Sequence, residues 1–242
     1  ADSFSNGPVF KISSTGSLTL SNIIIDGGAI FELTEDIVKG DTVTDSLSGI
    51  CAQDGPLIVN NGGTVNLNDG SVLKNSWYSY YSNYGGGAAV FMDSGELKIA
   101  GGQIINNYSE CSNTAGGAIY VTGGTINIFD GKISNNYSTK RGGGISVYPE
   151  DANVIINMTG GEISGNAAAI FGGGLSVKAS GSDNPVELYL ISGKMNNNYA
   201  KTYGGGAHLN MGNPQSKCIV GGYTTGTFEV YKNEVGLFSN TS

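Results

Sequence analysis

Basic side chains are scarce in this chain. Its 242 residues include only 12 lysines and arginines against 20 aspartates and glutamates, so the net charge is −8 at pH 7. Proteins that bind nucleic acids need basic side chains to neutralise phosphates, and anionic membranes attract proteins in the same way. No apolar run approaches the ~20 residues of a membrane-spanning helix. We therefore expect neither a nucleic-acid partner nor direct insertion into a membrane.

Histidine and cysteine are also rare. The only histidine is His208, and the three cysteines, Cys51, Cys111 and Cys218, lie far apart in the sequence. A zinc site built from these residue types has almost no material, and a disulfide framework needs regularly spaced cysteine pairs. We therefore expect no metal and no other cofactor. Whether Cys51 and Cys111 pair depends on how the loops that carry them fold, and the sequence leaves it open.

Proline is rare as well, whereas glycine is abundant, with 5 and 40 residues respectively. Hydrophobic residues make up 39% of the chain, which is enough for a packed core. Glycine without a three-residue period excludes collagen, and this composition does not match a disordered segment. The first ten residues, "ADSFSNGPVF", lack the basic and apolar regions of a signal peptide. We therefore expect a mature product or an excised fragment.

A repeat of about 30 residues organises the sequence. The stretch "GGTVNLNDGSVLKN" (62–75) closely resembles "GGTINIFDGKISNN" (123–136), and phrases such as "GGGISV" and "GGGLSV" precede each copy. Apolar residues alternate with period two in three segments of each repeat, which predicts three short strands. We name these segments A, B and C. Their expected inward residues are, for A, Leu57/Val59, Ala88/Val90, Ile119/Val121, Ile145/Val147, Leu175/Val177 and Ala207/Leu209; for B, Val65/Leu67, Leu97/Ile99, Ile126/Ile128, Ile156/Met158 and Leu188/Leu190; and for C, Val72, Ile104, Ile133, Ile163 and Met195.

Three short strands cannot bury their own apolar face, but stacked repeats can. The pattern therefore predicts an all-β fold, a right-handed parallel β-helix (solenoid) of about seven coils. We expect residues 1–242 to form a single domain. Residues 31–54 form an irregular insertion in it, and residues 210–242 form a C-terminal partial coil or cap.

Two polar columns accompany the strands. Glycines stand at the corner between B and C, where a sharp turn favours positive φ, although the first coil has Ile23 there. Asparagines follow segment C by three residues, and side chains one strand spacing apart can hydrogen-bond as a ladder. The glycines are Gly70, Gly102, Gly131, Gly161 and Gly193, and the asparagines are Asn75, Asn107, Asn136, Asn166 and Asn198.

The paired "GGA-I" and "I-x-x-N" phrases resemble the repeats of right-handed β-helix surface proteins of the polymorphic outer-membrane-protein type. The best match is "GGAI" (116–119), with "KISN" (132–135) near the second motif, and the resemblance covers about residues 55–209. It implies a pectate-lyase-like β-helix, an extracellular or cell-surface location and often adhesion. It also implies that the chain is part of a larger multidomain surface protein.

The corner between C and A varies most in length, and variable solenoid loops usually carry function. It holds the insertion 31–54 and the aromatic run "NSWYSYYSNYGGG" (75–87). Two interpretations stay open: the rings stack to cover the corner, or they form a recognition surface of rigid aromatic area and adaptable hydrogen bonds. The candidate ligand-binding residues are Trp77, Tyr78, Tyr80, Tyr81, Tyr84, Tyr108 and Tyr137.

Catalysis by a β-helix needs acids that converge. Most acids of this chain fall on different columns. Asp69 and Asp130 share a column, but they lie two coils apart and so do not converge. We therefore expect a non-catalytic extracellular adhesion or interaction domain that binds a host surface protein or glycan. The first alternative is a carbohydrate-active enzyme, a polysaccharide lyase or glycoside hydrolase, whose loop acids converge. The second is a structural spacer of a larger surface protein.

Overall fold

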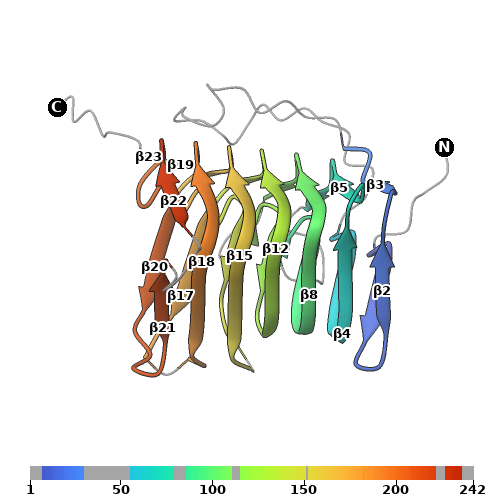
Figure 1. Ribbon diagram of the computed structural model, residues 1–242, viewed down its shortest axis with the longest axis horizontal. Coiled ribbons are helices and arrows are strands. Elements are labelled where there is room, and N and C mark those ends of the chain that lie inside the picture. Colours follow the sequence, from blue (N-terminus) through green and yellow to red (C-terminus); the bar gives the residue numbers. More distant parts are fainter. Residues whose placement is uncertain are drawn as a thin grey trace.

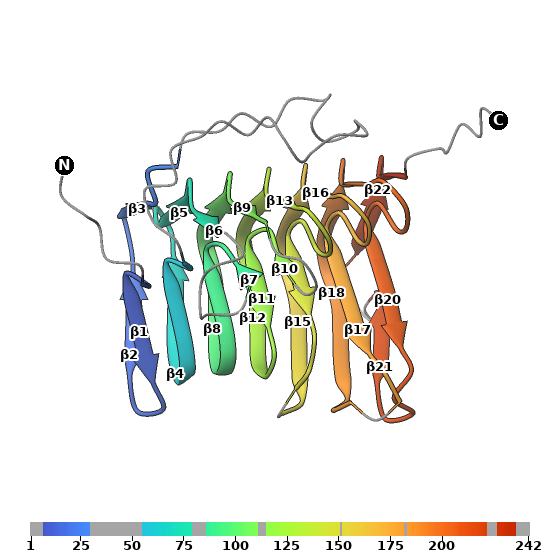
Figure 2. The same cartoon turned by 180° about the vertical axis from the view of Figure 1, so that it is seen from behind.

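The computed structural model of the protein describes residues 7–29, 55–78, 86–110, 115–150, 152–181, 183–221 and 227–235. These residues form parallel strands stacked as an all-β solenoid of about five turns, in which strands from successive repeats lie side by side along one axis (Figures 1 and 2). The expected all-β class and the stacking of parallel strands are confirmed.

Most strands belong to one large 15-stranded sheet. Segments B and C run on from each other through the corner as one long strand in most repeats, and β4 and β8 also include segment A. The A strands are β1 (Phe10–Ser13), β11 (Ile119–Val121), β14 (Ile145–Val147), β17 (Leu175–Ala179) and β20 (Ala207–Met211). The others are β2 (Ser17–Leu20), β3 (Ile24–Asp26), β4 (Ile58–Asn68), β5 (Val72–Lys74), β8 (Val90–Ile105), β12 (Gly124–Ser134), β15 (Val154–Ser164), β18 (Val186–Asn196), β21 (Lys217–Val220) and β22 (Phe228–Tyr231).

Two smaller sheets lie between C and A, where the sequence pattern gave no strand. The 6-stranded sheet contains only two-residue strands, one from each of six repeats, and it begins directly after the asparagine column. Its strands are β6 (Trp77–Tyr78), β9 (Tyr108–Ser109), β13 (Tyr137–Ser138), β16 (Ala167–Ala168), β19 (Tyr199–Ala200) and β23 (Glu234–Val235). The third sheet pairs β7 (Gly86–Gly87) with β10 (Ala115–Gly116).

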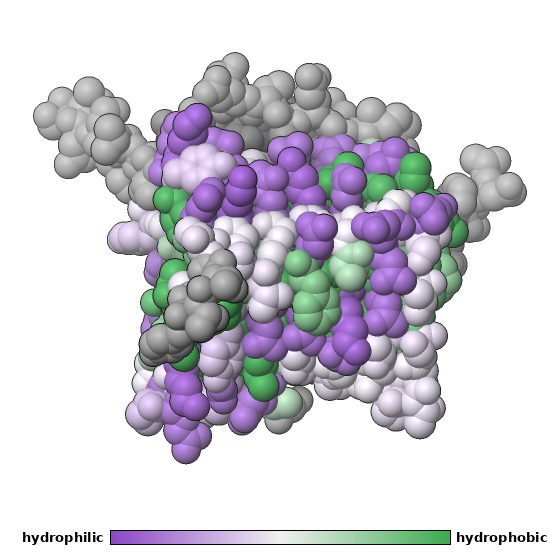
Figure 3. Space-filling view, viewed as in Figure 1, coloured by the Kyte–Doolittle hydropathy of each residue, from purple (hydrophilic) through white to green (hydrophobic). Residues whose placement is uncertain are grey.

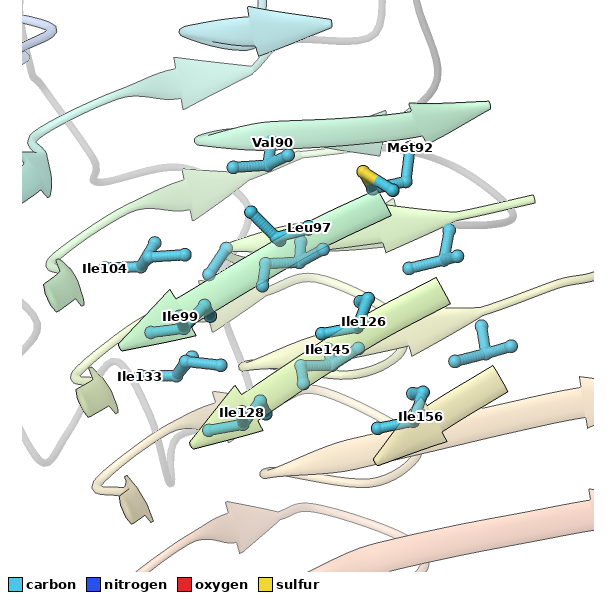
Figure 4. Packing of buried hydrophobic residues seen from close by; sticks show 14 of the residues in the cluster. Val90, Met92, Leu97, Ile99, Ile104, Ile126, Ile128, Ile133, Ile145 and Ile156 are labelled. Atoms are coloured by element: carbon cyan, nitrogen blue, oxygen red, sulfur yellow. The ribbon is translucent and has the colours of Figure 1, made fainter. Parts of the chain in front are cut away.

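The interior is a continuous column of aliphatic side chains. The B residues pair in the expected register, so that Ile126 aligns with Leu97 on one side and Ile156 on the other. All three are at most 1% exposed. Figure 4 shows such side chains from neighbouring coils pointing into one shared interior. The outward face of the B strands instead carries hydrophilic residues interleaved with neutral and hydrophobic ones (Figure 3). Alternation with period two thus identified the buried side of segment B correctly.

Segment A was assigned in the wrong frame in the repeat that contains β4. Ile58 and Asn60 align with Val90 and Met92 and face inward, in place of the predicted Leu57/Val59. In β8 the predicted frame is right, but the aligned inward pair lies two residues after the predicted Ala88/Val90. The predicted inward residues are apolar too, so alternation alone could not choose between the frames. Asn60 can be fully buried because its side chain is hydrogen-bonded to the backbone of the following turn. Its Nδ2 donates to Gly63 O at 3.0 Å, and its Oδ1 accepts from Gly63 N–H at 2.9 Å.

Segment C is shifted by one residue in the repeat that contains β5. Leu73, not the predicted Val72, aligns with Ile104 and is buried. The corner from Leu67 to the inward C residue is therefore one residue longer here than in the other repeats. Val72 and Leu73 are both apolar, which hid the insertion. The same shift moves the asparagine column, as described next.

Buried asparagines form the expected ladder. Each carboxamide donates from Nδ2 to Oδ1 of the next asparagine at 2.9–3.0 Å, and the backbone N–H beside it donates to the same oxygen. The prediction that Asn75 belongs to it was wrong, because Ser76 holds that position and its N–H donates to Asn107 Oδ1 at 3.1 Å. Asn75 lies in the adjacent left-handed column beside Asn106, with φ of 52° and 55°. The ladder comprises Asn107, Asn136, Asn166, Asn198 and also Asn233.

The glycine column at the corner between B and C is confirmed with one change. Gly70, Gly131, Gly161 and Gly193 adopt positive φ, but in β8 the positive φ of 95° belongs to Gly101 and not to the predicted Gly102. The register between β8 and its neighbours shifts at this corner, which accounts for the offset.

In the first coil, an asparagine takes the place of glycine at the corner between B and C. Asn22 is left-handed there (φ 52°), and its side chain lies against Gly70, where an added Cβ would be 2.3 Å from Asn22 Oδ1. Asparagine tolerates this conformation better than other non-glycine residues, so Ile23 beside it needs no special geometry.

Candidate functional site

The predicted ligand-binding residues divide into two groups. Tyr80, Tyr81 and Tyr84 lie outside the described residues, as do the insertion 31–54 and both Cys51 and Cys111. The other four lie in the 6-stranded sheet and are buried, with exposed fractions of 9% or less: Trp77, Tyr78, Tyr108 and Tyr137.

Three of these buried residues form what we call the inner column, which consists of Trp77, Tyr108 and Tyr137. Trp77 meets Tyr108 edge to face with ring centroids 5.2 Å apart. Tyr108 and Tyr137 stack in parallel with centroids 5.4 Å apart, because β9 and β13 pair in register. The rings form a hydrophobic cluster of their own together with Ala167 and Tyr199, separate from the main aliphatic core. In this arrangement the rings cover the corner from inside and present no face to a ligand.

Burial also shapes the chemistry of the inner column. Desolvation raises the pKa of the Tyr108 phenol, and the Glu110 and Tyr137 charges add to the shift. The pKa of Tyr137 is raised in the same way, by burial first and then by Tyr199 and Glu110. Both phenols therefore stay neutral, and no described residue forms a hydrogen bond with the Tyr137 hydroxyl. Packing is thus the role of these rings.

A second column runs along the same corner on its outer side. We call it the outer column; it consists of Arg141, Phe171, Tyr203 and His208. Parallel bridges join Arg141 to Phe171 and Phe171 to Tyr203. The Arg141 guanidinium lies 4.0 Å from the Phe171 ring centroid, and the Phe171 and Tyr203 rings stack at 5.3 Å. Tyr203 is 55% exposed, so the stack reaches solvent.

His208 joins this column from the last A strand. The centroid of its ring lies 4.7 Å from that of Phe171 and 6.1 Å from that of Tyr203. Partial burial lowers the pKa of His208, and the Arg141 charge lowers it further. Its Nδ1 is buried and forms no hydrogen bond with any described residue. The imidazole is therefore neutral near pH 7 and acts as a third ring of the stack.

Arg141 is the only arginine of the chain. Burial lowers the pKa of its guanidinium, although arginine remains charged at all ordinary pH values. Within the part of the chain that the structure describes, Arg141 forms no ion pair. The outer column therefore combines flat aromatic faces with an uncompensated cation, a combination that can hold a ring or a polar group of a ligand.

The outer column escaped the sequence analysis, although a signal was present. The phrases "RGGG", "FGGG" and "YGGG" place Arg141, Phe171 and Tyr203 directly before three glycines. The glycines let the backbone fold close: a Cβ on Gly172 would lie 2.1 Å from Leu175 O. Arg141, Phe171 and Tyr203 thereby take equivalent positions on the outer side of the corner.

A shallow groove of about 440 Å³ lies on the opposite corner, between B and C. Its floor is made by the glycine column and its walls by charged residues: Asp130, Lys132, Glu162, Lys194 and Glu229. Lys132 Nζ lies 3.6 Å from Glu162 Oε2, and Lys194 Nζ lies 3.9 Å from Glu229 Oε2.

Glu162 of this groove is poorly suited to act as a general acid. Burial raises the pKa of Glu162, but hydrogen bonds from Ser164 and Asn196 and the charge of Lys132 outweigh it and lower the value overall. A general acid of a glycosidase needs a raised pKa. The pairing of alternating charges along this groove is instead typical of cross-strand stabilisation.

Further searches complete the description of the site. No group of three or more histidine, cysteine or acidic residues that could hold a metal occurs within the described ranges. Among the same residues, no helix is long and apolar enough to cross a membrane. The chain matches no protein-family model, no curated protein and no solved structure.

Proposed function

We propose that the chain is a non-catalytic recognition domain of a cell-surface protein, which binds a host surface protein or glycan through the corner between C and A. The proposal rests chiefly on the outer column, where aromatic faces and an unpaired guanidinium reach solvent. The asparagine ladder and the aliphatic core hold these side chains on a rigid scaffold. Sites built on rigid elements orient their contacts at little entropic cost.

Tyr80, Tyr81 and Tyr84 remain part of the proposed surface. They precede β7 in the sequence, as Arg141, Phe171 and Tyr203 precede β14, β17 and β20. Trp77, Tyr78, Tyr108 and Tyr137 are reassigned by this proposal to the support beneath the surface, because they are buried. The extracellular location, the right hand and the seven coils belong to the proposal as well. They rest on the repeat pattern, its resemblance to β-helix surface proteins, and the strong preference of parallel crossovers for the right hand.

The test is a screen of the full chain against arrays of glycans and extracellular proteins. Any hit is then measured with Phe171→Ala and Tyr203→Ala. Truncation of aromatic contacts at a binding centre typically costs about 2 kcal/mol or more, so we expect each variant to bind at least about tenfold more weakly. Phe129→Ala is the matched control, since Phe129 is 49% exposed but lies on the corner between B and C. Equal binding by all three variants would disprove the assignment of the surface.

A carbohydrate-active enzyme is the second candidate, and the groove with Asp130, Glu162 and Glu229 is the observation that favours it. The full chain should therefore also be incubated with acidic and neutral polysaccharides. Turnover that disappears in Glu162→Gln would replace the binding proposal, whereas array binding without turnover supports it.

A further inference from the structure

Among the described residues, the C-terminal face of the solenoid leaves core side chains exposed. Leu209, Val220 and Val230 align with Val177, Leu190 and Met195 of the preceding coil. The residues of the preceding coil are at most 4% exposed, whereas those of the last coil are 40%, 59% and 59% exposed. Cys218, which aligns with buried Leu188, is exposed as well. The inward side chains are thus in place, but nothing in the described residues packs on their outer side.

The opposite face differs. Ile12 and Leu20, the corresponding inward residues of the first coil, are only 9% and 5% exposed. Phe10, Leu18 and Ile25 of the first coil are partly buried. Among the described residues, the C-terminal end therefore presents the more exposed apolar cross-section beside its strand edges. Open parallel edges and apolar faces of this kind readily accept another strand.

The asparagine ladder specifies what can pack there. In every rung the earlier asparagine donates, from its backbone N–H and its Nδ2, to Oδ1 of the later one, as Asn198 does to Asn233 at 3.0 and 2.9 Å. Asn233 also donates from Nδ2 to Met195 O at 3.0 Å. No described residue accepts a hydrogen bond from Asn233 N–H. The last rung therefore presents donors outward and requires an acceptor oxygen at the next rung.

This polarity argues against a second copy of the chain. Two C-terminal faces related by a two-fold axis would oppose donors with donors. A head-to-tail copy would offer its first coil, which has glycine at this turn: Gly27 lies against Ser76, where an added Cβ would be 2.7 Å from Ser76 Cα. Glycine has no side-chain oxygen that could accept the ladder bonds. Neither arrangement completes the last rung.

We propose that the C-terminal face is the docking surface for a further coil of the same repeat. Its three strands would add in parallel to β20, β21 and β22, its inward aliphatic residues would cover Leu209, Val220 and Val230, and its asparagine would supply the oxygen for Asn233. This interface is separate from the recognition surface proposed above and stands without it.

The test inserts a copy of residues 167–198 between Asn233 and Glu234 of the full chain. The copy begins at the position equivalent to Glu234 and ends in a ladder asparagine, so the register is kept. We expect amide hydrogen exchange in β20, β21 and β22 to slow by at least about tenfold, because their outer edges become hydrogen-bonded. The change Asn198→Ala, made only in the copy, should abolish most of this protection.

Two controls decide the outcome. A copy carrying Leu188→Asp and Leu190→Asp has the same length but cannot pack inward, and it should give no protection. Unchanged exchange with the intact copy would overturn the proposal. Sedimentation of the unaltered chain addresses the other occupant: a concentration-dependent dimer that Val230→Lys dissociates would show that a second copy covers this face, whereas a monomer agrees with the proposal.

Discussion

The inner column and the outer column both contain stacked aromatic rings on one corner, but the inner rings are buried and the outer stack reaches solvent. Tyr137 follows a ladder asparagine directly and is fully buried, whereas Tyr203 precedes three glycines and is 55% exposed. Rings stack one repeat apart in both columns, with centroids 5.4 Å and 5.3 Å apart. Stacking therefore follows from the parallel register alone. The neighbouring residues, asparagine or glycine, decide whether the stack becomes core or surface.

The asparagines beside the inner column are expected to matter most for stability. Asn166 bonds Asn198 Oδ1 twice and Ile133 O once, and it accepts two bonds from Asn136. Asn166→Ala leaves several of these buried groups without partners, at about 1–3 kcal/mol each, so we expect a loss of about 3–6 kcal/mol. Urea unfolding measures it. Asn157→Ala is the control: Asn157 donates a single side-chain bond, from Nδ2 to Asn127 Oδ1 on the outer face, and its loss should cost under about 1 kcal/mol. Similar losses in both variants would contradict the comparison.

The Tyr137 hydroxyl offers a finer test of the inner column. It is buried without a hydrogen-bond partner among the described residues. Tyr137→Phe removes an unsatisfied polar group and keeps the ring, so we expect stability to stay equal or to rise by up to about 1 kcal/mol. Thermal or urea unfolding would show it, with Tyr203→Phe as the exposed counterpart, expected within about 0.5 kcal/mol of the parent. A loss above about 1 kcal/mol in Tyr137→Phe would mean that the hydroxyl has a partner.

Acidification should act weakly, through the outer column. The pKa of His208 is lowered in the folded chain, so the unfolded chain, with a pKa near 6.5, binds the proton more readily. The stabilisation is present above pH ~6.5. It is lost as the pH falls from the pKa of His208 in the unfolded chain to its lower pKa in the folded chain. Because the ring is largely solvated, we expect well under about 1 kcal/mol. Urea midpoints of the parent and His208→Gln at pH 7.5 and pH 5 test this, and identical pH dependence would exclude His208 as the cause.

Much of the fold could be predicted because the repeat supplies several aligned copies. Segment B alternates between apolar and polar residues in most repeats, and every predicted pair from Val65 to Leu190 has the expected register. The frame was lost where two adjacent residues are both apolar, at Val72 and Leu73 and at Leu57 and Ile58 by the start of β4. There the structure is decided by hydrogen bonds, such as those of Asn60, that alternation does not encode.

The candidate site was predicted less well than the fold. Aromatic composition pointed to the corner between C and A, but composition does not tell which side of a two-residue strand faces the core. Trp77, Tyr108 and Tyr137 proved buried, while the residues that face solvent, Arg141, Phe171 and Tyr203, are scattered singly in the sequence. The one feature that these residues share in the sequence is their position directly before three glycines. Its effect depends on how closely the glycine backbone packs, which a sequence pattern does not show.

The direction of the asparagine ladder also bears on how the chain folds. The backbone N–H and Nδ2 of each ladder asparagine, from Asn107 to Asn198, find their acceptor oxygen on the following coil. A chain emerging from the ribosome therefore always carries one incomplete rung, at its newest coil. Each added coil supplies the acceptor oxygens for the ladder asparagine of the coil before it. We therefore expect the most recently added coil to be the least stable.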